Sequence, residues 1–419
     1  MFLRMLITVV FLFVIDIYVF SGLKVLLRNS TLISERTGTI IFWSLCGLCY
    51  ALILAAAIYD YHEWNKTFRT YSFAFVVIFY FSKLFFVVFL LIDDIIRGVR
   101  YLISMFDKSD AKELTLASGG EKISRQSFIV KTGLLVAAIP FGAMIYGMVK
   151  GAYNYSVRKI TLKHDGIPKA FDGFRIVQIS DLHTGSFTFE HKVDRAVDII
   201  LAQKPDIVFF TGDLVNEKSI EAEPFIELFG RIKAPHGVFS ILGNHDYGDY
   251  HRWDSPEAKI ANLDRLKAIH AEMGWNLMLD TNHHVEKDGE KIGLVGVQNW
   301  SSHMQFPKYG DLGKATNNFV PQGFNILLSH DPSHWTSEVL TKFPFIHLML
   351  AGHTHGMQFG IEIPGFKWSP VQYIYKEWAG LYTAAKQHLY VNRGLGFLGY
   401  PGRVGIMPEI TVIDLKYSS

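Results

Sequence analysis

Four long apolar stretches in the first third of this 419-residue chain restrict its fold more than any other feature. Each stretch is long enough to cross the hydrocarbon core of a bilayer as a helix. The last of them is the shortest and contains Pro140, which membrane helices tolerate. The sequence therefore predicts a transmembrane anchor in residues 1–150, with four helices near residues 5–26, 38–59, 71–92 and 132–149.

Composition divides the chain into two different pieces. Of its 17 histidines, only His62 precedes residue 150, whereas the apolar excess is concentrated before that point. The formal net charge is +2, which gives no reason to expect a nucleic-acid partner. The only two cysteines, Cys46 and Cys49, lie inside an apolar stretch at a spacing that shares one helix face, so we interpret them as small packing residues. The second piece therefore has neither disulfides nor thiolate ligands.

Lysine and arginine residues predict the orientation of the anchor. Four spans place both chain ends on one side, and the two loops of the opposite side hold ten of these cations against eight on the side of the ends. The basic loop before the fourth span is therefore predicted to be cytoplasmic, and the C-terminal domain extracytoplasmic. This interpretation makes the chain a multi-pass membrane protein.

A segment before the fourth span agrees with this orientation. Ser124 to Lys131, followed by an apolar run, resembles a twin-arginine export signal, although Gln126 stands where the second arginine belongs. A basic flank of an ordinary span is the alternative.

Two ionisable residues lie inside the predicted spans. Asp16 and Lys83 are each about eleven or twelve residues into spans that run in the same direction, so the two can lie at similar depth. An unpaired charge in the bilayer is costly, so Asp16 and Lys83 could pair. The alternative is that Lys83 reaches the interface and Asp16 faces a polar neighbour.

From about residue 156, short β-rich runs alternate with amphipathic segments, and helices are predicted at residues 190–203, 221–232 and 256–272. Five of the apolar runs end in polar side chains. In α/β folds, sites gather at the carboxyl ends of strands, so these side chains can build one site. The side chains in chain order are Asp181 and His183, Asp213, the Asn244-His245-Asp246 group, His330, and finally His353 and His355.

The donor atoms of this set are nitrogen and oxygen, without sulfur. They suit divalent manganese, iron, cobalt or zinc, and they are numerous enough for two ions. Asp213 stands alone after its strand, so its carboxylate could bridge both ions. Two adjacent ions can activate water and hold the oxygens of an in-line phosphoryl displacement.

The ordered motifs DLH, GDLVN, GNHD, LLSH and GHTH resemble those of the calcineurin-like metallophosphoesterase superfamily. The resemblance covers about residues 170–360. It extends to membrane-associated bacterial phosphodiesterases through the N-R-G-L-G stretch from Asn392 to Gly396, which implies a location in a bacterial cytoplasmic (inner) membrane. The sequence departs from the family pattern at Met357, where a second glycine is usual after the last histidine.

The resemblance implies a fold and a role for each residue. Residues 156–419 would form an α/β domain in which two mixed β-sheets are sandwiched between helices. One ion would be held by one ligand set and the second ion by another, with Asp213 as the bridge. His245 would act as general acid or stabilise charge, and Asp246 would orient it. The two ligand sets are Asp181, His183 and His355, and Asn244, His330 and His353.

The function implied is hydrolysis of a phosphodiester or pyrophosphate bond by a metal-activated hydroxide, in a lipid-linked or envelope-related substrate because the domain is tethered to a membrane. The cofactors would be two divalent ions of manganese, iron or zinc. His334, Arg393 and Arg403 are further candidates for substrate contacts, although a structural salt bridge is an equal reading of the arginines. Two alternatives remain: a UDP-diacylglucosamine-type pyrophosphate hydrolase, and a catalytically silent, metal-binding sensory module of the membrane region.

Overall fold

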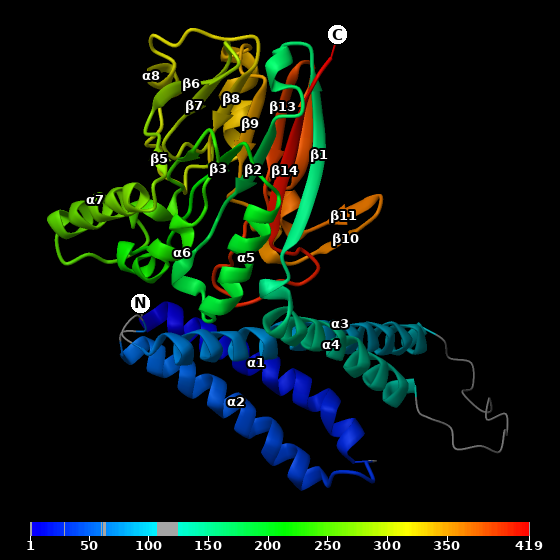
Figure 1. Ribbon diagram of the computed structural model, residues 1–419. Coiled ribbons are helices and arrows are strands. Elements are labelled where there is room, and N and C mark those ends of the chain that lie inside the picture. Colours follow the sequence, from blue (N-terminus) through cyan, green and yellow to red (C-terminus); the bar gives the residue numbers. More distant parts are fainter. Residues whose placement is uncertain (1, 29, 60, 62–63, 107–124, 419) are drawn as a thin grey trace. The chain divides into compact units, whose positions relative to one another are not determined.

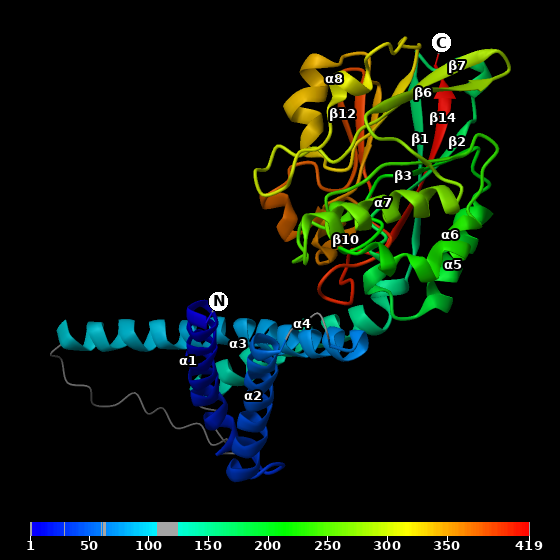
Figure 2. The ribbon, with the colours of Figure 1, turned by 90° about the vertical axis from the view of Figure 1, so that its left-hand side faces the viewer.

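The computed structural model describes residues 2–28, 30–59, 61, 64–106 and 125–418 (Figures 1 and 2). The chain divides into two compact units, Met1–Tyr146 and Gly147–Ser419. The sequence-based limits of 1–150 and 156–419 stay a prediction. Most of the segment that resembles an export signal begins the fourth helix, while Ser124 lies outside the described residues.

Four helices are long and apolar enough to cross a membrane, which confirms the predicted anchor. The third is longer than the predicted span, because the helix continues through a polar turn in which Arg97 pairs with Asp93 at 3.1 Å and with Asp94. The fourth begins seven residues before the predicted span, since its basic flank is itself helical. The helices are α1 (Phe2–Leu27), α2 (Glu35–Ile58), α3 (Lys66–Phe106) and α4 (Arg125–Val149).

Of the two interpretations of Asp16 and Lys83, the structure shows the pair. Lys83 Nζ lies 2.5 Å from Asp16 Oδ1, and both side chains are buried. Asp16 Oδ2 accepts hydrogen bonds from the hydroxyls of Tyr80, at 2.9 Å, and Tyr50. Lys83 also donates to Cys46 Sγ at 3.3 Å, so this cysteine packs against the pair. The charges are thus satisfied by neighbours from three helices.

Breaking this pair should destabilise the anchor. Asp16→Ala and Lys83→Ala should each lower the free energy of unfolding by about 3 kcal/mol, because each leaves one buried charge without its partner. Thermal unfolding in detergent measures this, and the double variant should be no less stable than the weaker single variant. Fully additive losses would contradict a direct coupling.

The second unit contains two mixed six-stranded sheets and a separate hairpin, β10 (Ile361–Ile363) with β11 (Phe366–Trp368). Each sheet combines parallel and antiparallel pairs. The first, in spatial order, is β1 (Ser156–His164), β14 (Glu409–Tyr417), β2 (Arg175–Ile179), β3 (Ile207–Phe210), β4 (Val238–Ser240) and β5 (Asn276–Leu277). The second is β12 (Gly380–Ala384), β13 (Gln387–Val391), β9 (Leu348–Ala351), β8 (Asn325–Leu328), β7 (Glu290–Gly296) and β6 (Thr281–Lys287).

Strand β3 shows how the sequence builds the layers. Its four residues are all buried, and alternate side chains point to opposite faces of the sheet. Ile207 and Phe209 join the core between the two sheets, whereas Val208 and Phe210 join the core beneath the outer helices. A continuous apolar run is therefore what a strand covered on both faces requires.

Helices cover the outer faces of both sheets, which confirms the predicted sandwich (Figure 1). The predicted helix at 221–232 was too long. Its first part is a 3₁₀ turn at Glu223–Phe225 that contains Pro224, preceded by another at Ser219–Glu221. Only the five residues of α6 are α-helical. The helices are α5 (Glu190–Ala202), α6 (Ile226–Gly230) and α7 (Pro256–Glu272) on the first sheet, with α8 (Leu312–Ala315) and α9 (Leu340–Lys342) on the second.

One core histidine makes stability depend on pH. His270 on α7 is fully buried, its Nδ1 lies 3.0 Å from Ser240 Oγ, and burial lowers its pKa to about 3. As pH falls below about 6.5, the unfolded chain binds a proton that the folded chain cannot accept, so this contribution to stability is lost between about pH 6.5 and pH 3. At pH 5 the loss should be about 2 kcal/mol.

The variant His270→Gln should show a smaller drop in unfolding temperature between pH 7.5 and pH 5 than the unsubstituted chain. Substitution of His191, which is exposed on α5, serves as the control and should leave the drop unchanged. Equal drops in all three proteins would contradict the assignment.

Candidate metal centre

The polar residues expected at strand ends are brought together at the carboxyl ends of β2, β3, β4, β8 and β9. Five of them adopt left-handed backbone conformations that L-residues rarely occupy, at a cost of roughly 1–2 kcal/mol each. Such turns reverse the chain directly after a strand and aim successive side chains at one point. The φ angles are 52° at Asp181, 48° at His183, 61° at Asp213, 70° at His353 and 51° at His355.

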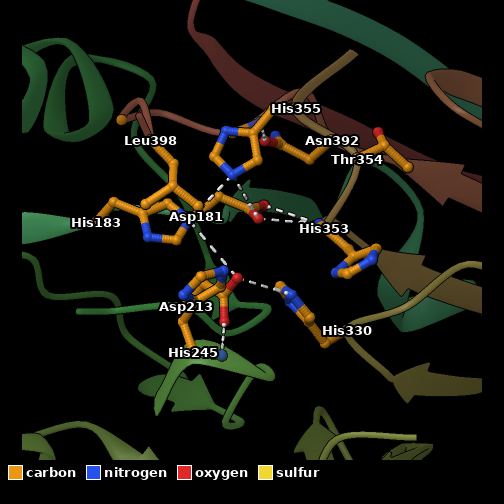
Figure 3. A network of polar contacts seen from close by, with 12 residues as sticks. Asp181, His183, Asp213, His245, His330, His353, Thr354, His355, Asn392 and Leu398 are labelled. Atoms are coloured by element: carbon orange, nitrogen blue, oxygen red, sulfur yellow. Dashed lines mark hydrogen bonds and ion pairs between the residues drawn. The ribbon is translucent and has the colours of Figure 1, made fainter. Parts of the chain in front are cut away.

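One group of donor atoms consists of Asp181, His183 and His355, all buried (Figure 3). His355 Nε2 lies 3.2 Å from Asp181 Oδ1 and 3.0 Å from His183 Nε2. The Asp181 carboxylate also accepts the backbone N–H of His353 at 3.0 Å. Two imidazole nitrogens and a carboxylate oxygen thus converge on one point.

A second group consists of Asp213, His330 and His353. His330 Nε2 lies 3.1 Å from Asp213 Oδ2, and His353 Nδ1 lies 2.8 Å from Asn244 Oδ1. The Asn244 amide donates to the Tyr250 hydroxyl at 2.9 Å, which turns its Oδ1 toward His353. Asn244 therefore joins this group with an oxygen atom.

Asp213 reaches both groups. Its Oδ2 lies 3.6 Å from His183 Nε2 as well as 3.1 Å from His330 Nε2. Burial opposes any charge here, yet the Asp213 carboxylate raises the pKa of His330 to about 10, and the charges of His330 and His245 hold the pKa of Asp213 well below its usual range. The pocket between these side chains thus favours positive charge.

The donor set fits divalent ions. Two nitrogens that bind one ion at about 2.1 Å lie about 3 to 3.5 Å apart, as His183 Nε2 and His355 Nε2 do. His330 Nδ1 donates to the Thr211 carbonyl at 2.7 Å, so Nε2 is the atom that would bind a metal once the ring has lost its extra proton. This buried Nε2 makes no hydrogen bond among the described residues.

His245 follows Asn244 directly but does not belong to either donor group. Its backbone N–H donates to Asp213 Oδ1 at 2.9 Å, and its Nδ1–H donates to the Asn216 carbonyl at 2.8 Å. The expectation that Asp246 orients this ring was wrong. The Asp246 carboxylate instead accepts backbone N–H groups of Asp213, Leu214, Val215 and Gly243 at 2.8–3.2 Å, because the turns after β3 and β4 leave those donors without strand partners.

The three candidate substrate contacts all have partners within the protein. His334 is buried, stacks on Trp300 and contacts Ser329 Oγ and Glu338. Arg393 forms ion pairs with Glu409 at 2.6 Å and Glu362 at 2.7 Å, as the structural alternative predicted.

Arg403 is buried among the carbonyls of Gly394, Gly396 and His355, and its Nη2 lies 3.3 Å from His355 Nδ1. It therefore supports a donor residue rather than facing a cleft.

Three residues of the centre were not predicted from the sequence. Tyr375 places its hydroxyl 2.9 Å from His353 Nε2 and 3.1 Å from Asp331 Oδ2. Asp331 directly follows His330, and this adjacency is a usable signal. Tyr375 and Tyr250 lie in irregular segments and carry no pattern that would have marked them.

Two glycines permit close approach at the centre. A Cβ on Gly352 would lie 2.0 Å from Ser180 Oγ, and one on Gly396 would lie 1.9 Å from the Leu182 carbonyl. The N-R-G-L-G stretch can therefore lie against the DLH turn, where Gly396 donates its N–H to the Asp181 carbonyl at 2.8 Å.

The fold and this centre define a metallophosphoesterase attached to a membrane region. The profile described as "Calcineurin-like phosphoesterase" matches residues 174–357, and the profile described as "Probable Calcineurin-like phosphoesterase, transmembrane domain" matches residues 3–152. The chain belongs to the calcineurin-like phosphoesterase family and is a hydrolase of phosphoric esters. The resemblance found in the sequence is thereby confirmed.

Three relatives illustrate this membership. The metallophosphoesterase YkuE of Bacillus subtilis is 30% identical over 71% of this chain and 99% of its own length. The phosphodiesterase YaeI of Escherichia coli is 26% identical over 70% and 99%, respectively. The UDP-2,3-diacylglucosamine pyrophosphatase LpxG of Chlamydia muridarum is 29% identical over 62% and 89%.

Proposed function

We propose that this protein is a membrane-tethered, two-metal phosphoesterase that cleaves a phosphodiester or pyrophosphate bond. The observation that carries the proposal is the position of Asp213, whose Oδ2 contacts His183 of one donor group and His330 of the other. A carboxylate between two groups of nitrogen and oxygen donors is suited to bridging two divalent ions. YaeI is named as a phosphodiesterase and LpxG as a pyrophosphatase, which supports these two bond types.

The chain's own residues would divide the work. Asp181, His183 and His355 would hold one ion, Asn244, His330 and His353 the other, and Asp213 both. When bound, the ions supply an activated water and neutralise charge on the phosphoryl group. His245 would protonate the leaving oxygen through Nε2, because its Nδ1 is committed to the Asn216 carbonyl. Asp246 would fix the Asp213 turn.

The substrate is proposed to be lipid-linked or envelope-related, since the catalytic unit is attached to four membrane helices. The excess of lysine and arginine in the loop before α4 supports an extracytoplasmic catalytic unit in a bacterial inner membrane. A reporter enzyme fused after residue 160 should be active outside the cytoplasm. Activity confined to the cytoplasm would overturn this topology.

The named activity of LpxG favours a second candidate, cleavage of UDP-diacylglucosamine or a similar nucleotide-linked lipid. Such precursors are cytosolic, so this candidate requires the opposite topology. The reporter fusion therefore separates the two.

The test of the main proposal uses the full chain in detergent with manganese and a generic aryl phosphodiester. Hydrolysis that disappears on chelation and returns with the metal should be observed. A protein that binds manganese but cleaves neither the diester, an aryl pyrophosphate nor a lipid panel would be the silent binding module instead.

A further inference from the structure

The hairpin β10–β11 carries its charged and its apolar side chains on opposite faces. Cross-strand partners in an antiparallel pair lie on the same face of the ribbon. Ile361 pairs with Trp368 and Ile363 with Phe366, while Glu362 pairs with Lys367 between them. One face is thus entirely apolar or aromatic, and the other carries two charges.

The charged face contacts the catalytic unit. Glu362 accepts hydrogen bonds from Arg393 Nη2 and Arg158 Nη2, both at 2.7 Å. Lys367 Nζ donates to the Ala379 carbonyl at 2.5 Å and to the Tyr382 hydroxyl at 3.2 Å. These contacts fix which way the hairpin faces, so its apolar side cannot turn toward the core.

Three of the four residues on the apolar face are exposed, and Trp368 is half-buried. Ile361 is 50% exposed, Ile363 58% and Phe366 53%, and the hairpin belongs to neither six-stranded sheet (Figure 1). A half-buried antiparallel ribbon in water normally shows the opposite arrangement, with apolar side chains on the core. The face therefore needs another partner.

Neighbouring residues extend this surface. Tyr373 accepts a hydrogen bond from Trp368 Nε1 at 3.5 Å and is 78% exposed, and the adjacent Ile374 is 54% exposed. Met357 is 51% exposed with a φ of 55°. An exposed methionine in a conformation that disfavours side chains is unfavourable unless the side chain gains a contact. We call these seven residues the apolar ridge: Met357, Ile361, Ile363, Phe366, Trp368, Tyr373 and Ile374.

We propose that the apolar ridge inserts into the interfacial region of the lipid bilayer. Aliphatic side chains with tryptophan, tyrosine and a nearby lysine are the composition that proteins place at this depth. A bilayer is also within reach of the catalytic unit, because only residues 150–155 connect the membrane helix α4 to β1. A contiguous exposed apolar patch on a unit tethered in this way marks a membrane contact.

The ridge is joined to the metal centre by a short path. Tyr375 directly follows Ile374 and hydrogen-bonds His353 Nε2. Ser369 directly follows Trp368 and donates to the Gly356 carbonyl, next to His355. Insertion of the ridge would therefore hold the donor turn of β9 close to the lipid headgroups.

Depth-dependent fluorescence quenching tests the insertion independently of any substrate. The variants Ile363→Cys and Phe366→Cys are labelled with bimane in the full chain, and the chain is reconstituted in phosphatidylethanolamine–phosphatidylglycerol vesicles. Val320→Cys, at a 64% exposed position outside the ridge, is the matched control. The unsubstituted chain gives the labelling background, since Cys46 and Cys49 are buried. An unchanged unfolding temperature verifies the fold of each variant.

Phosphatidylcholine with brominated acyl chains should cause about a twofold loss of emission at both ridge positions, as expected for probes about 5–10 Å into the headgroup boundary, and none at Val320. Aqueous iodide should show the reverse. Quenching of the ridge probes by iodide to the same extent as the control would overturn the proposal. Protection from both quenchers would also overturn it, because protein rather than lipid would then cover the ridge.

Discussion

Asp213→Asn should abolish hydrolysis, with a loss of more than about a thousandfold in kcat/KM. The Asp213 carboxylate lies within 3.6 Å of His183 Nε2 and 3.1 Å of His330 Nε2, so one substitution weakens both donor groups. An amide has the same shape but lacks the negative charge that favours cations in this pocket. Turnover of an aryl phosphodiester and manganese content after dialysis measure the effect.

Asp331→Asn is the matched control for this substitution. Asp331 is also a buried carboxylate of the site. Its Oδ2 accepts the Tyr375 hydroxyl at 3.1 Å and lies 3.6 Å from His353 Nε2, so it contacts one donor group and not both. Its loss should lower metal affinity about 10- to 100-fold, as for other groups that orient a ligand. If Asp213→Asn retained both ions and most turnover, the bridging role would be refuted.

His245→Ala should lower turnover by about 10²- to 10⁴-fold while leaving the metal content unchanged. The reason is that His245 belongs to neither donor group, although its backbone N–H contacts the Asp213 carboxylate at 2.9 Å. A general acid matters most when the leaving oxygen is basic. The loss should therefore be large for an alkyl phosphodiester and small for a nitrophenyl one.

A second histidine variant controls for this effect. His191→Ala, at an exposed position on α5, should leave the rates for both substrates unchanged. An equal loss for alkyl and nitrophenyl substrates in His245→Ala would show that His245 stabilises charge or structure rather than transferring a proton. Loss of metal in that variant would show that it acts through the Asp213 turn.

The sequence predicted those features that are marked by a local pattern, such as a short apolar run that ends in a polar residue. The strand ends carrying Asp181, Asp213 and His330 were found because each follows an apolar run too short for a helix. The sequence could suggest the Asp16–Lys83 pair because an isolated charge inside an apolar stretch is costly unless it has a partner.

Features that depend on distant parts of the chain were not predictable in the same way. Asp246 was placed against His245 because the two are adjacent in sequence, but the turn after β3 left backbone N–H groups that Asp246 satisfies first. The stacking of Trp300 on His334 and the contact of Arg403 with His355 arise from packing between segments far apart in the chain. Likewise, the outward apolar face of β10–β11 follows from a register that the short alternating run does not determine alone.

The ion pair in the anchor also has a consequence for how the protein is made. Asp16 enters the membrane on α1, whereas its partner Lys83 is synthesised 67 residues later on α3. Until α3 arrives, the nascent chain carries an uncompensated carboxyl group into lipid. Helix α1 therefore cannot reach its final environment by itself. We expect α1 and α3 to leave the insertion machinery together. In a polypeptide that stops after α2, Asp16 would lack its charged partner. Such a polypeptide should be recognised and degraded by membrane quality control.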